Sequence, residues 1–254
     1  MRYLLYLVLL IISLSSCSVS QHTYSTKGGF DVQLDTNRLF DQSRQREIPV
    51  ALYQPITNET YQKIVIFSHG YGHNYQKNYL VYSYLTNYLA SKGYFVVSIQ
   101  HELPTDSILP FTGIPQVVRL PFWERGVENI QFVINSLKTS NPSLDFEHIT
   151  LIGHSNGGDM VALFPSIYPN YVERIITLDH LRVPLPMEEH LSVFSLRSND
   201  KYADTGVLPS EIEQQSFGIK IIKLEQVNHN NMNDFAKKSQ KKLILSYIND
   251  FMSH

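Results

Sequence analysis

Cysteine is nearly absent from this chain of 254 residues, in which Cys17 is the only one. A single cysteine cannot form an intramolecular disulfide, and without a cysteine and histidine cluster it supports neither a zinc finger nor an iron–sulfur site. Basic residues are not in excess either, because 21 Lys and Arg stand against 23 Asp and Glu. A chain without a positive surplus has little with which to neutralise nucleic-acid phosphates. We therefore expect no nucleic-acid partner.

Long apolar runs are also missing, except at the N-terminus. Arg2 precedes an apolar stretch over residues 3–14, which is shorter than the ~20 residues of a membrane-spanning helix and fits a secretory signal. The stretch ends in Leu14-Ser15-Ser16-Cys17, which resembles the bacterial lipobox, where the cysteine is lipidated and becomes the mature N-terminus. The resemblance implies that residues 1–16 are a signal peptide and that Cys17 anchors the protein to a membrane.

The residues after Cys17 refine this expectation. Ser18 follows the cysteine, and by resemblance to lipoprotein sorting rules this favours the outer membrane of a bacterial cell envelope, with the protein facing the periplasm. Residues 17–29 then comprise the lipidated cysteine and a flexible tether rich in Ser, Thr and Gly. An ordinary secretory signal or an uncleaved anchor is the alternative.

Residues 30–254 are predicted to form one α/β domain. Short β-branched runs alternate with segments of helical periodicity, which is typical of a mostly parallel sheet flanked by helices. Strands are expected at residues 48–53, 63–67, 95–99, 149–152, 175–178, 192–196 and 219–224. Helices are expected at residues 79–91, 126–137, 157–167 and 232–252, and a loop at 110–121.

The most specific motif is Gly153-His154-Ser155-Asn156-Gly157, which lies between an expected strand and an expected helix. This is G-x-S-x-G in the strand–turn–helix context of a nucleophile elbow. A sharp turn must hold the serine hydroxyl outward, and glycines on either side remove the Cβ atoms that would clash. The motif predicts Ser155 as a nucleophile.

A reactive serine needs amide groups that stabilise an oxyanion. The backbone amide of Asn156 lies at the start of the helix after Ser155. Upstream, His69-Gly70-Tyr71 follows another expected strand, and the amide of Tyr71 is the predicted second donor. His69 itself is expected to be a structural residue of this turn.

The base is expected among ten histidines. In this motif's chain order the triad histidine follows the serine and the acid. His229 lies after the last expected strand and before the last expected helix, so it is the predicted base. His154 is pinned beside the nucleophile, where we expect it to pack or to orient a neighbour.

Two carboxylates compete for the acid of the triad. Asp200 follows the expected strand at 192–196, and Asp179 follows the strand at 175–178. Both satisfy the order serine, acid, histidine. The residues favour Asp200, with Asp179 as the alternative and Asp204 as a weaker third. The carboxylate that is not the acid is expected to order a loop, paired with Arg182 or Arg197.

These motifs resemble the serine esterases of α/β-hydrolase fold over nearly all of residues 30–254. Ser68-His69-Gly70, the elbow, and Leu178-Asp179 with Pro184 look like hydrolases related to platelet-activating-factor acetylhydrolase and dienelactone hydrolase. The opening stretches 46–50 and 53–55 resemble the same group, whose acid lies after the earlier strand, at Asp179. The spacing from Ser155 to Asp200 and His229 instead resembles the bacterial polyester hydrolases. The two resemblances agree on Ser155 and His229 and disagree on the acid.

The resulting hypothesis is a serine hydrolase that cleaves carboxylic esters through an acyl-enzyme. Its triad needs neither a metal nor an organic cofactor, and its partner is a small-molecule or lipid-like ester. The short segment between Asp179 and Ser192 leaves no room for a large cap domain, so an open site is expected, bordered by residues 110–123. The alternatives are a non-catalytic envelope binding protein on the same fold, and a peptidase or acyltransferase with the same triad.

Overall fold

The central feature of the structure is one twisted sheet. A computed structural model describes residues 22–24, 28–59 and 61–253, so the predicted signal peptide and Cys17 lie outside the described residues. Within the described residues nine strands are ordered β1-β2-β3-β5-β4-β6-β7-β8-β9. Their bounds are β1 His22–Tyr24, β2 Val32–Asp41, β3 Arg46–Pro55, β4 Lys63–Ser68, β5 Phe95–Ile99, β6 Asp145–His154, β7 Arg174–Leu178, β8 Ser192–Arg197 and β9 Lys220–Lys223.

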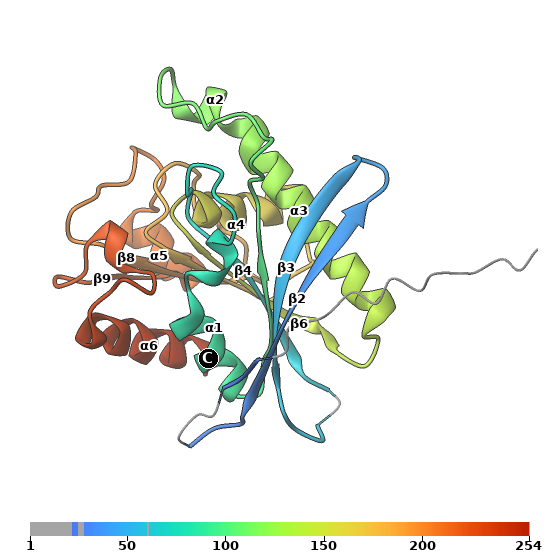
Figure 1. Cartoon of the computed structure of the whole chain (residues 1–254). Helices are drawn as coiled ribbons and strands as arrows, with labels where there is room; N and C mark the ends of the chain where they lie inside the picture. The colour runs from blue at the N-terminus through green and yellow to red at the C-terminus, as the bar shows by residue number, and fades with distance from the viewer. Residues whose placement is uncertain (1–21, 25–27, 60, 254) are drawn as a thin grey trace, which may run out of the picture.

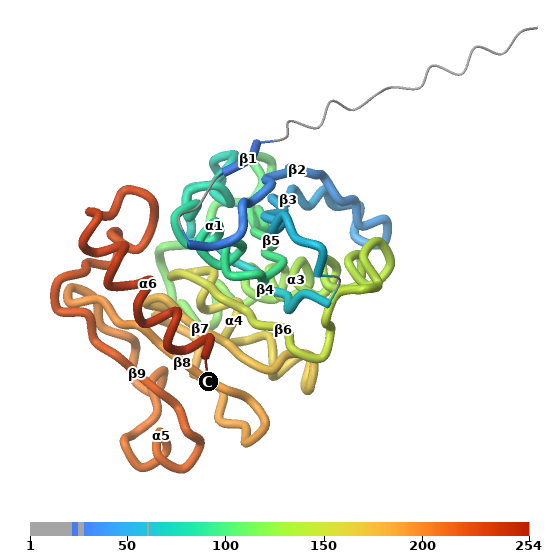
Figure 2. Tube along the Cα trace, turned by 90° about the horizontal axis from the view of Figure 1, so that it is seen from below, coloured from blue at the N-terminus to red at the C-terminus, as the bar shows by residue number. Residues whose placement is uncertain are grey.

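The strand directions divide the sheet into two parts. From β5 to β9 each strand pairs in parallel with its neighbour, whereas β1, β2 and β3 pair antiparallel and β3 joins β5 antiparallel. Figure 2 shows β1 and β2 at one end of the sheet and β8 and β9 at the other. The carboxyl ends of the parallel strands therefore form one common edge, where sites in such sheets are built.

Helices cover both faces of the sheet. The α-helices are α1 Ser83–Ser91, α2 Pro115–Val118, α3 Leu120–Ser140, α4 Asn156–Ile167, α5 Glu211–Phe217 and α6 Lys238–Met252, and the 3₁₀ helices are η1 Asn78–Leu80 and η2 His229–Asn231. Figure 1 shows α3 and α4 on one side of the sheet and α1 and α6 on the other. Two hydrophobic clusters correspond to these two layers. The structure thus confirms the predicted mostly parallel sheet flanked by helices.

The periodicity of α3 explains its packing. Trp123, Val127, Ile130, Ile134 and Leu137 are all buried and recur every three or four residues, which places them on one helical face. This face packs against the sheet in the same cluster as residues of α4. Each buried side chain of this size contributes about 1.5–3 kcal/mol to folding.

All seven predicted strands are present, but other elements differ from the prediction. β2 was not expected, because the centre of this strand is exposed and carries polar residues. β1 lies in the predicted tether and pairs with β2 through Thr23 and Gln33. α5 has no buried residue, so it lacks the apolar stripe that reveals a helix. The predicted loop at 110–121 contains α2 and the start of α3.

The predicted helix at 232–252 begins six residues late, at Lys238. The cause is Asp234, whose carboxylate accepts hydrogen bonds from the N–H groups of Ser83 and Tyr84, both at 2.9 Å. These bonds cap the start of α1 and hold the segment before α6 in a non-helical conformation. Among the described residues, no helix combines the length and the apolar character needed to cross a membrane. Residues 179–191 contain no helix.

Candidate active site

Ser155 lies in the sharp turn between the end of β6 and the start of α4. Its backbone has φ 51° and ψ −120°, a region that side-chain-bearing residues rarely adopt and that costs of the order of 1–3 kcal/mol. The turn places the serine at the common carboxyl edge of the parallel strands. This is the strand–turn–helix geometry that the G-x-S-x-G motif predicts.

The glycines of the motif are required by close backbone contacts. A Cβ atom on Gly153 would lie 2.3 Å from the carbonyl oxygen of Gly157. A Cβ on Gly157 would lie 2.3 Å from the carbonyl oxygen of Ser68, at the end of β4. Because these are backbone atoms, they cannot move aside as a flexible side chain would. The elbow therefore packs directly on β4, which leads into residues 69–71, the predicted oxyanion loop.

A continuous hydrogen-bond chain joins Ser155, His229 and Asp179. The Ser155 Oγ atom lies 2.9 Å from His229 Nε2, and His229 Nδ1 lies 2.6 Å from Asp179 Oδ2. Because a carboxylate only accepts, the Nδ1 proton points at Asp179 and Nε2 accepts the serine proton. Three residues from three different strand ends thus meet in the order that nucleophilic catalysis by serine requires.

Asp179 is rigidly held and fully buried, at 0% exposure. Its other oxygen, Oδ1, accepts the N–H of Ser198 at 2.9 Å and pairs with the Arg197 guanidinium at 3.1 Å. Burial opposes ionisation, but the hydrogen bonds from His229 and Ser198 and the charge of Arg197 together lower the pKa of Asp179 below its ordinary value. The Asp179 carboxylate that faces the imidazole is therefore ionised at neutral pH.

Asp200, which the residues alone favoured as the acid, occupies a different place. Its Oδ1 accepts the backbone N–H of His229 at 2.7 Å, whereas the imidazole contacts Asp179. Order along the chain could not separate the two, because both follow strands that end at the same edge. Asp204 pairs with Arg182. Asp200 orders the segment that carries His229, but its expected partners Arg182 and Arg197 pair instead with Asp204 and Asp179.

The predicted oxyanion donors lie on two neighbouring elements. Asn156 is the first residue of α4, so its amide has no acceptor within the helix and lies at the positive end of the helix dipole. Tyr71 follows β4, and its hydroxyl accepts the N–H of Leu109 at 3.1 Å. Its ring centroid lies 6.0 Å from that of Phe111. These contacts fix Tyr71 against the loop before α2.

The side chain of Asn156 is clamped by two buried residues that the motifs did not indicate. Its Oδ1 accepts the indole N–H of Trp123 at 2.9 Å, and its Nδ2 donates to Glu102 Oε1 at 3.0 Å. Glu102 is 1% exposed, and burial raises its pKa to about 7. Its position three residues after the end of β5, at the edge that carries Ser155, was the available signal. Glu102 and Trp123 thereby hold the start of α4 in place.

Asp159 fixes the loop after Asp179. Its Oδ1 accepts the N–H groups of Leu181, Arg182 and Val183 at 3.2, 2.8 and 3.1 Å. Burial raises the pKa of the Asp159 carboxyl to about 6 despite these bonds. The helix that begins at the elbow thus also determines the path of the loop that follows the acid.

Several other histidines of the described residues make structural contacts. His69 is buried, its Nδ1 lies 2.8 Å from the carbonyl oxygen of Gly70, and its Nε2 accepts the N–H of His101 at 3.1 Å. It is a residue of the turn, as expected. His148 contacts Asp145, and His190 contacts Glu188. In the described part of the chain, no group of three or more His, Cys, Asp and Glu side chains is placed to hold a metal ion.

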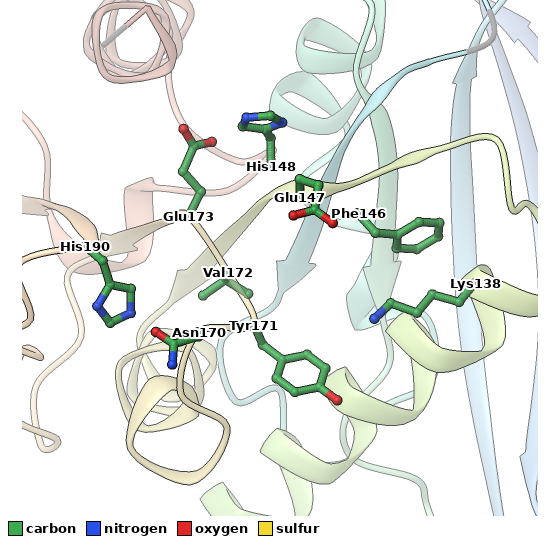
Figure 3. Close-up of a pocket in the computed structure, with 9 residues that line it drawn as sticks. All are labelled: Lys138, Phe146, Glu147, His148, Asn170, Tyr171, Val172, Glu173 and His190. Atoms are coloured by element: carbon green, nitrogen blue, oxygen red, sulfur yellow. The ribbon is translucent and has the colours of Figure 1, made fainter.

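Figure 3 shows the residues that line a pocket of about 510 Å³. The pocket lies at the opposite edge of the sheet from Ser155. Its residues lie beside the starts of β6, β7 and β8, whereas Ser155 follows the end of β6. They are Lys138, Phe146, Glu147, His148, Asn170, Tyr171, Val172, Glu173 and His190. This pocket therefore plays no part in the arrangement around the serine.

Comparisons with known proteins agree with this architecture. No family model matches the chain, and neither does any curated protein. Solved structures do match. A candidate dienelactone hydrolase from Klebsiella pneumoniae subsp. pneumoniae aligns with a TM-score of 0.65 and 12% identity, over 87% of this chain and 99% of that one.

Two further structures align over similar lengths. A dienelactone hydrolase-like promiscuous phosphotriesterase from metagenomic libraries gives a TM-score of 0.63 at 12% identity, covering 87% of this chain and 98% of that one. An esterase from Pyrobaculum calidifontis gives 0.59 at 13% identity, covering 85% and 82%. At identities of 12–13% these alignments show that the backbones share a fold, and they do not show that the proteins share a reaction. The protein has the α/β-hydrolase fold.

Proposed function

We propose that this protein is a serine hydrolase that cleaves carboxylic esters. The observation that carries the proposal is the hydrogen-bond chain from Ser155 through His229 to Asp179, at 2.9 and 2.6 Å. This series of hydrogen bonds begins at a serine in a strained turn and ends at a buried, ionised carboxylate. A merely structural serine needs neither feature. The hydrolases among the similar structures support the same reading.

In the first half of the reaction Ser155 forms a bond to the ester carbonyl carbon. His229 Nε2 takes the serine proton, and Asp179 stabilises the resulting imidazolium. The amides of Asn156 and Tyr71 donate to the negatively charged carbonyl oxygen. When the tetrahedral intermediate collapses, the bond to the alcohol oxygen breaks and His229 returns its proton to that oxygen. The products of this half are the free alcohol and an acyl-serine.

In the second half water replaces the alcohol. His229 takes a proton from the water as its oxygen attacks the acyl carbon, and the same two amides stabilise the second oxyanion. Collapse breaks the bond to Ser155 Oγ, which recovers its proton from the imidazolium. One ester and one water thus become one acid and one alcohol. Amide hydrolysis and acyl transfer use the same groups, so the leaving group and the acceptor separate these alternatives.

The test of this proposal is labelling of the purified protein with a fluorophosphonate probe, together with turnover of p-nitrophenyl acetate, butyrate and octanoate. We expect covalent labelling at Ser155 and release of p-nitrophenol, because the activated serine attacks both electrophiles. Labelling without ester turnover would favour a peptidase or an acyltransferase. If the folded protein neither labels nor turns over any ester, a non-catalytic binding protein becomes the better explanation.

We also propose that the protein is a lipid-anchored component of a bacterial cell envelope. The support is the apolar stretch that ends in Leu14-Ser15-Ser16-Cys17, together with the small side chains before the cysteine. Expression in bacteria fed an alkyne-tagged fatty acid should label the wild-type chain and send it to the membrane fraction. Cys17→Ala should remove the label. Labelling that survives Cys17→Ala would overturn lipidation at this residue.

A further inference from the structure

A chain of hydrogen bonds runs from the oxyanion loop to the peptide group of His229. The Gly70 amide lies 3.1 Å from the Tyr82 hydroxyl oxygen, which lies 2.7 Å from His154 Nδ1. His154 Nε2 then lies 3.0 Å from the carbonyl oxygen of His229. Tyr82 and His154 are 3% and 5% exposed, so water does not compete for these bonds. These hydrogen bonds connect Gly70, the residue before Tyr71, with the proposed base His229.

The direction of each bond in this chain is determined. A carbonyl oxygen only accepts, so His154 Nε2 carries a proton. Burial above all, and then the neighbouring His229, lower the pKa of His154 to about 3, against the opposing charge of Asp179. The imidazole is therefore neutral at pH 7, and its Nδ1 is an acceptor. It follows that Tyr82 donates its hydroxyl proton to His154 and accepts the N–H of Gly70.

His229 is thereby held at four points. Its imidazole contacts Asp179 and Ser155. Its backbone N–H donates to Asp200 at 2.7 Å, and its backbone carbonyl accepts from His154 at 3.0 Å. The first two contacts belong to the proposed chemistry, whereas the last two hold only the main chain. They fix the position from which the imidazole projects.

The close packing of this chain explains the glycine at position 70. A Cβ atom on Gly70 would lie 2.7 Å from His154 Nδ1 and 3.2 Å from the Tyr82 hydroxyl oxygen. The contact at 2.7 Å is too short for two non-bonded atoms, so a side chain at position 70 would displace the His154 imidazole. The oxyanion loop can therefore approach the histidine only through a residue that has no side chain.

We propose that His154 is a positioning residue that, through Tyr82 and Gly70, holds the Tyr71 amide and the His229 imidazole at a fixed separation. The two groups come from loops after β4 and β9, which lie far apart in the order of the sheet. Catalysis by both groups at one carbonyl requires their separation to be maintained, since misplacement by ~1 Å costs up to ~100-fold in rate. This inference rests on the proposed hydrolase function.

The direct test is Tyr82→Phe, compared with Tyr88→Phe. The first variant keeps the ring, which packs 4.7 Å from that of Phe67, but removes the hydroxyl that joins Gly70 to His154. We expect kcat for p-nitrophenyl butyrate to fall roughly 10- to 100-fold with little change in KM, because ground-state binding is untouched. Tyr88 lies in α1, which begins directly after Tyr82, and its hydroxyl donates to Asn249 at 2.9 Å. Tyr88→Phe should match the wild type.

A second measurement tests the hydrogen bonds of His154 and does not depend on substrate turnover. Nitrogen NMR of protein labelled with ¹⁵N-histidine distinguishes the two neutral tautomers of an imidazole from its protonated form. We expect the His154 signal, identified by its loss in His154→Gln, to be neutral with the proton on Nε2 throughout about pH 5 to 8. In Tyr82→Phe the Nε2 proton still donates to the His229 carbonyl, so the tautomer should persist, whereas Nδ1 loses its donor and its ¹⁵N resonance should shift towards that of an unbonded imidazole nitrogen.

These measurements separate the positioning role from the hydrolase proposal. Unchanged kcat in Tyr82→Phe, or a wild-type His154 with its proton on Nδ1, would overturn the positioning role while leaving the ester hydrolase intact. An equal fall in kcat for Tyr82→Phe and Tyr88→Phe would also overturn it, because general destabilisation would explain both. A wild-type protein that fails to turn over any ester would instead overturn the hydrolase proposal, and the NMR spectra would still test the hydrogen-bond chain.

Discussion

Replacing Ser155 with alanine is expected to lower kcat for p-nitrophenyl esters by about 10⁶-fold. The substitution removes the only group in the site that forms a covalent bond to the substrate in the proposed reaction. Loss of one member of such a triad abolishes its combined effect, leaving the contribution of the oxyanion donors and of binding. Fluorophosphonate labelling should vanish in the same variant. Steady-state kinetics with p-nitrophenyl butyrate and labelling of the two proteins provide the measurement.

Ser155→Gly is the matched control for folding. Glycine tolerates the φ of 51° at this position, so relief of backbone strain should raise the free energy of unfolding by about 1 kcal/mol. Activity should be lost as in Ser155→Ala. A variant that is more stable and inactive would show that the turn is strained in order to present the hydroxyl. If either variant retains wild-type turnover, another residue is the nucleophile.

Asp179→Asn is expected to lower kcat by about 10⁴-fold. The amide would present an N–H group to His229 Nδ1, so the imidazole would have to carry its proton on Nε2, where it can no longer accept the proton of Ser155. The substitution would also remove the charge that stabilises the imidazolium. Circular dichroism should show that the variant folds, since the new side chain keeps an oxygen that can face Arg197 and Ser198.

Asp200→Asn makes the same chemical change at the other candidate acid. Here the carboxylate accepts only a backbone N–H, from His229, and an asparagine oxygen accepts that bond as well. The bond weakens by about 1 kcal/mol at most, so kcat should fall by no more than about fivefold. Equal losses of about 10⁴-fold in the two variants would contradict this assignment, and so would a larger loss in Asp200→Asn. The pair therefore decides between the two acids.

The central strands could be predicted because strands that are buried on both faces appear in the sequence as short runs of apolar residues. In β5 and β7 most residues are Val, Ile, Leu or Phe, and every residue is buried. β2 has no such apolar run, since its exposed middle carries Thr36, Asn37 and Arg38. Its residues are held by pairing with β3 over its full length, an interaction between strands that a pattern within one strand does not encode.

The sequence by itself determined the elbow and the order of its partners. The turn around Ser155 depends on glycines and on local backbone conformation, which are short-range properties, and the position of His229 follows from the order of strands and helices. Only the tertiary structure decided which carboxylate contacts Nδ1. Asp179 and Asp200 both follow strands at one edge of the sheet, and the choice depends on where loops distant in the chain direct their side chains. The link from Gly70 through Tyr82 and His154 to His229 has the same origin, because it joins four segments whose proximity arises from the packing of helices and loops on the sheet.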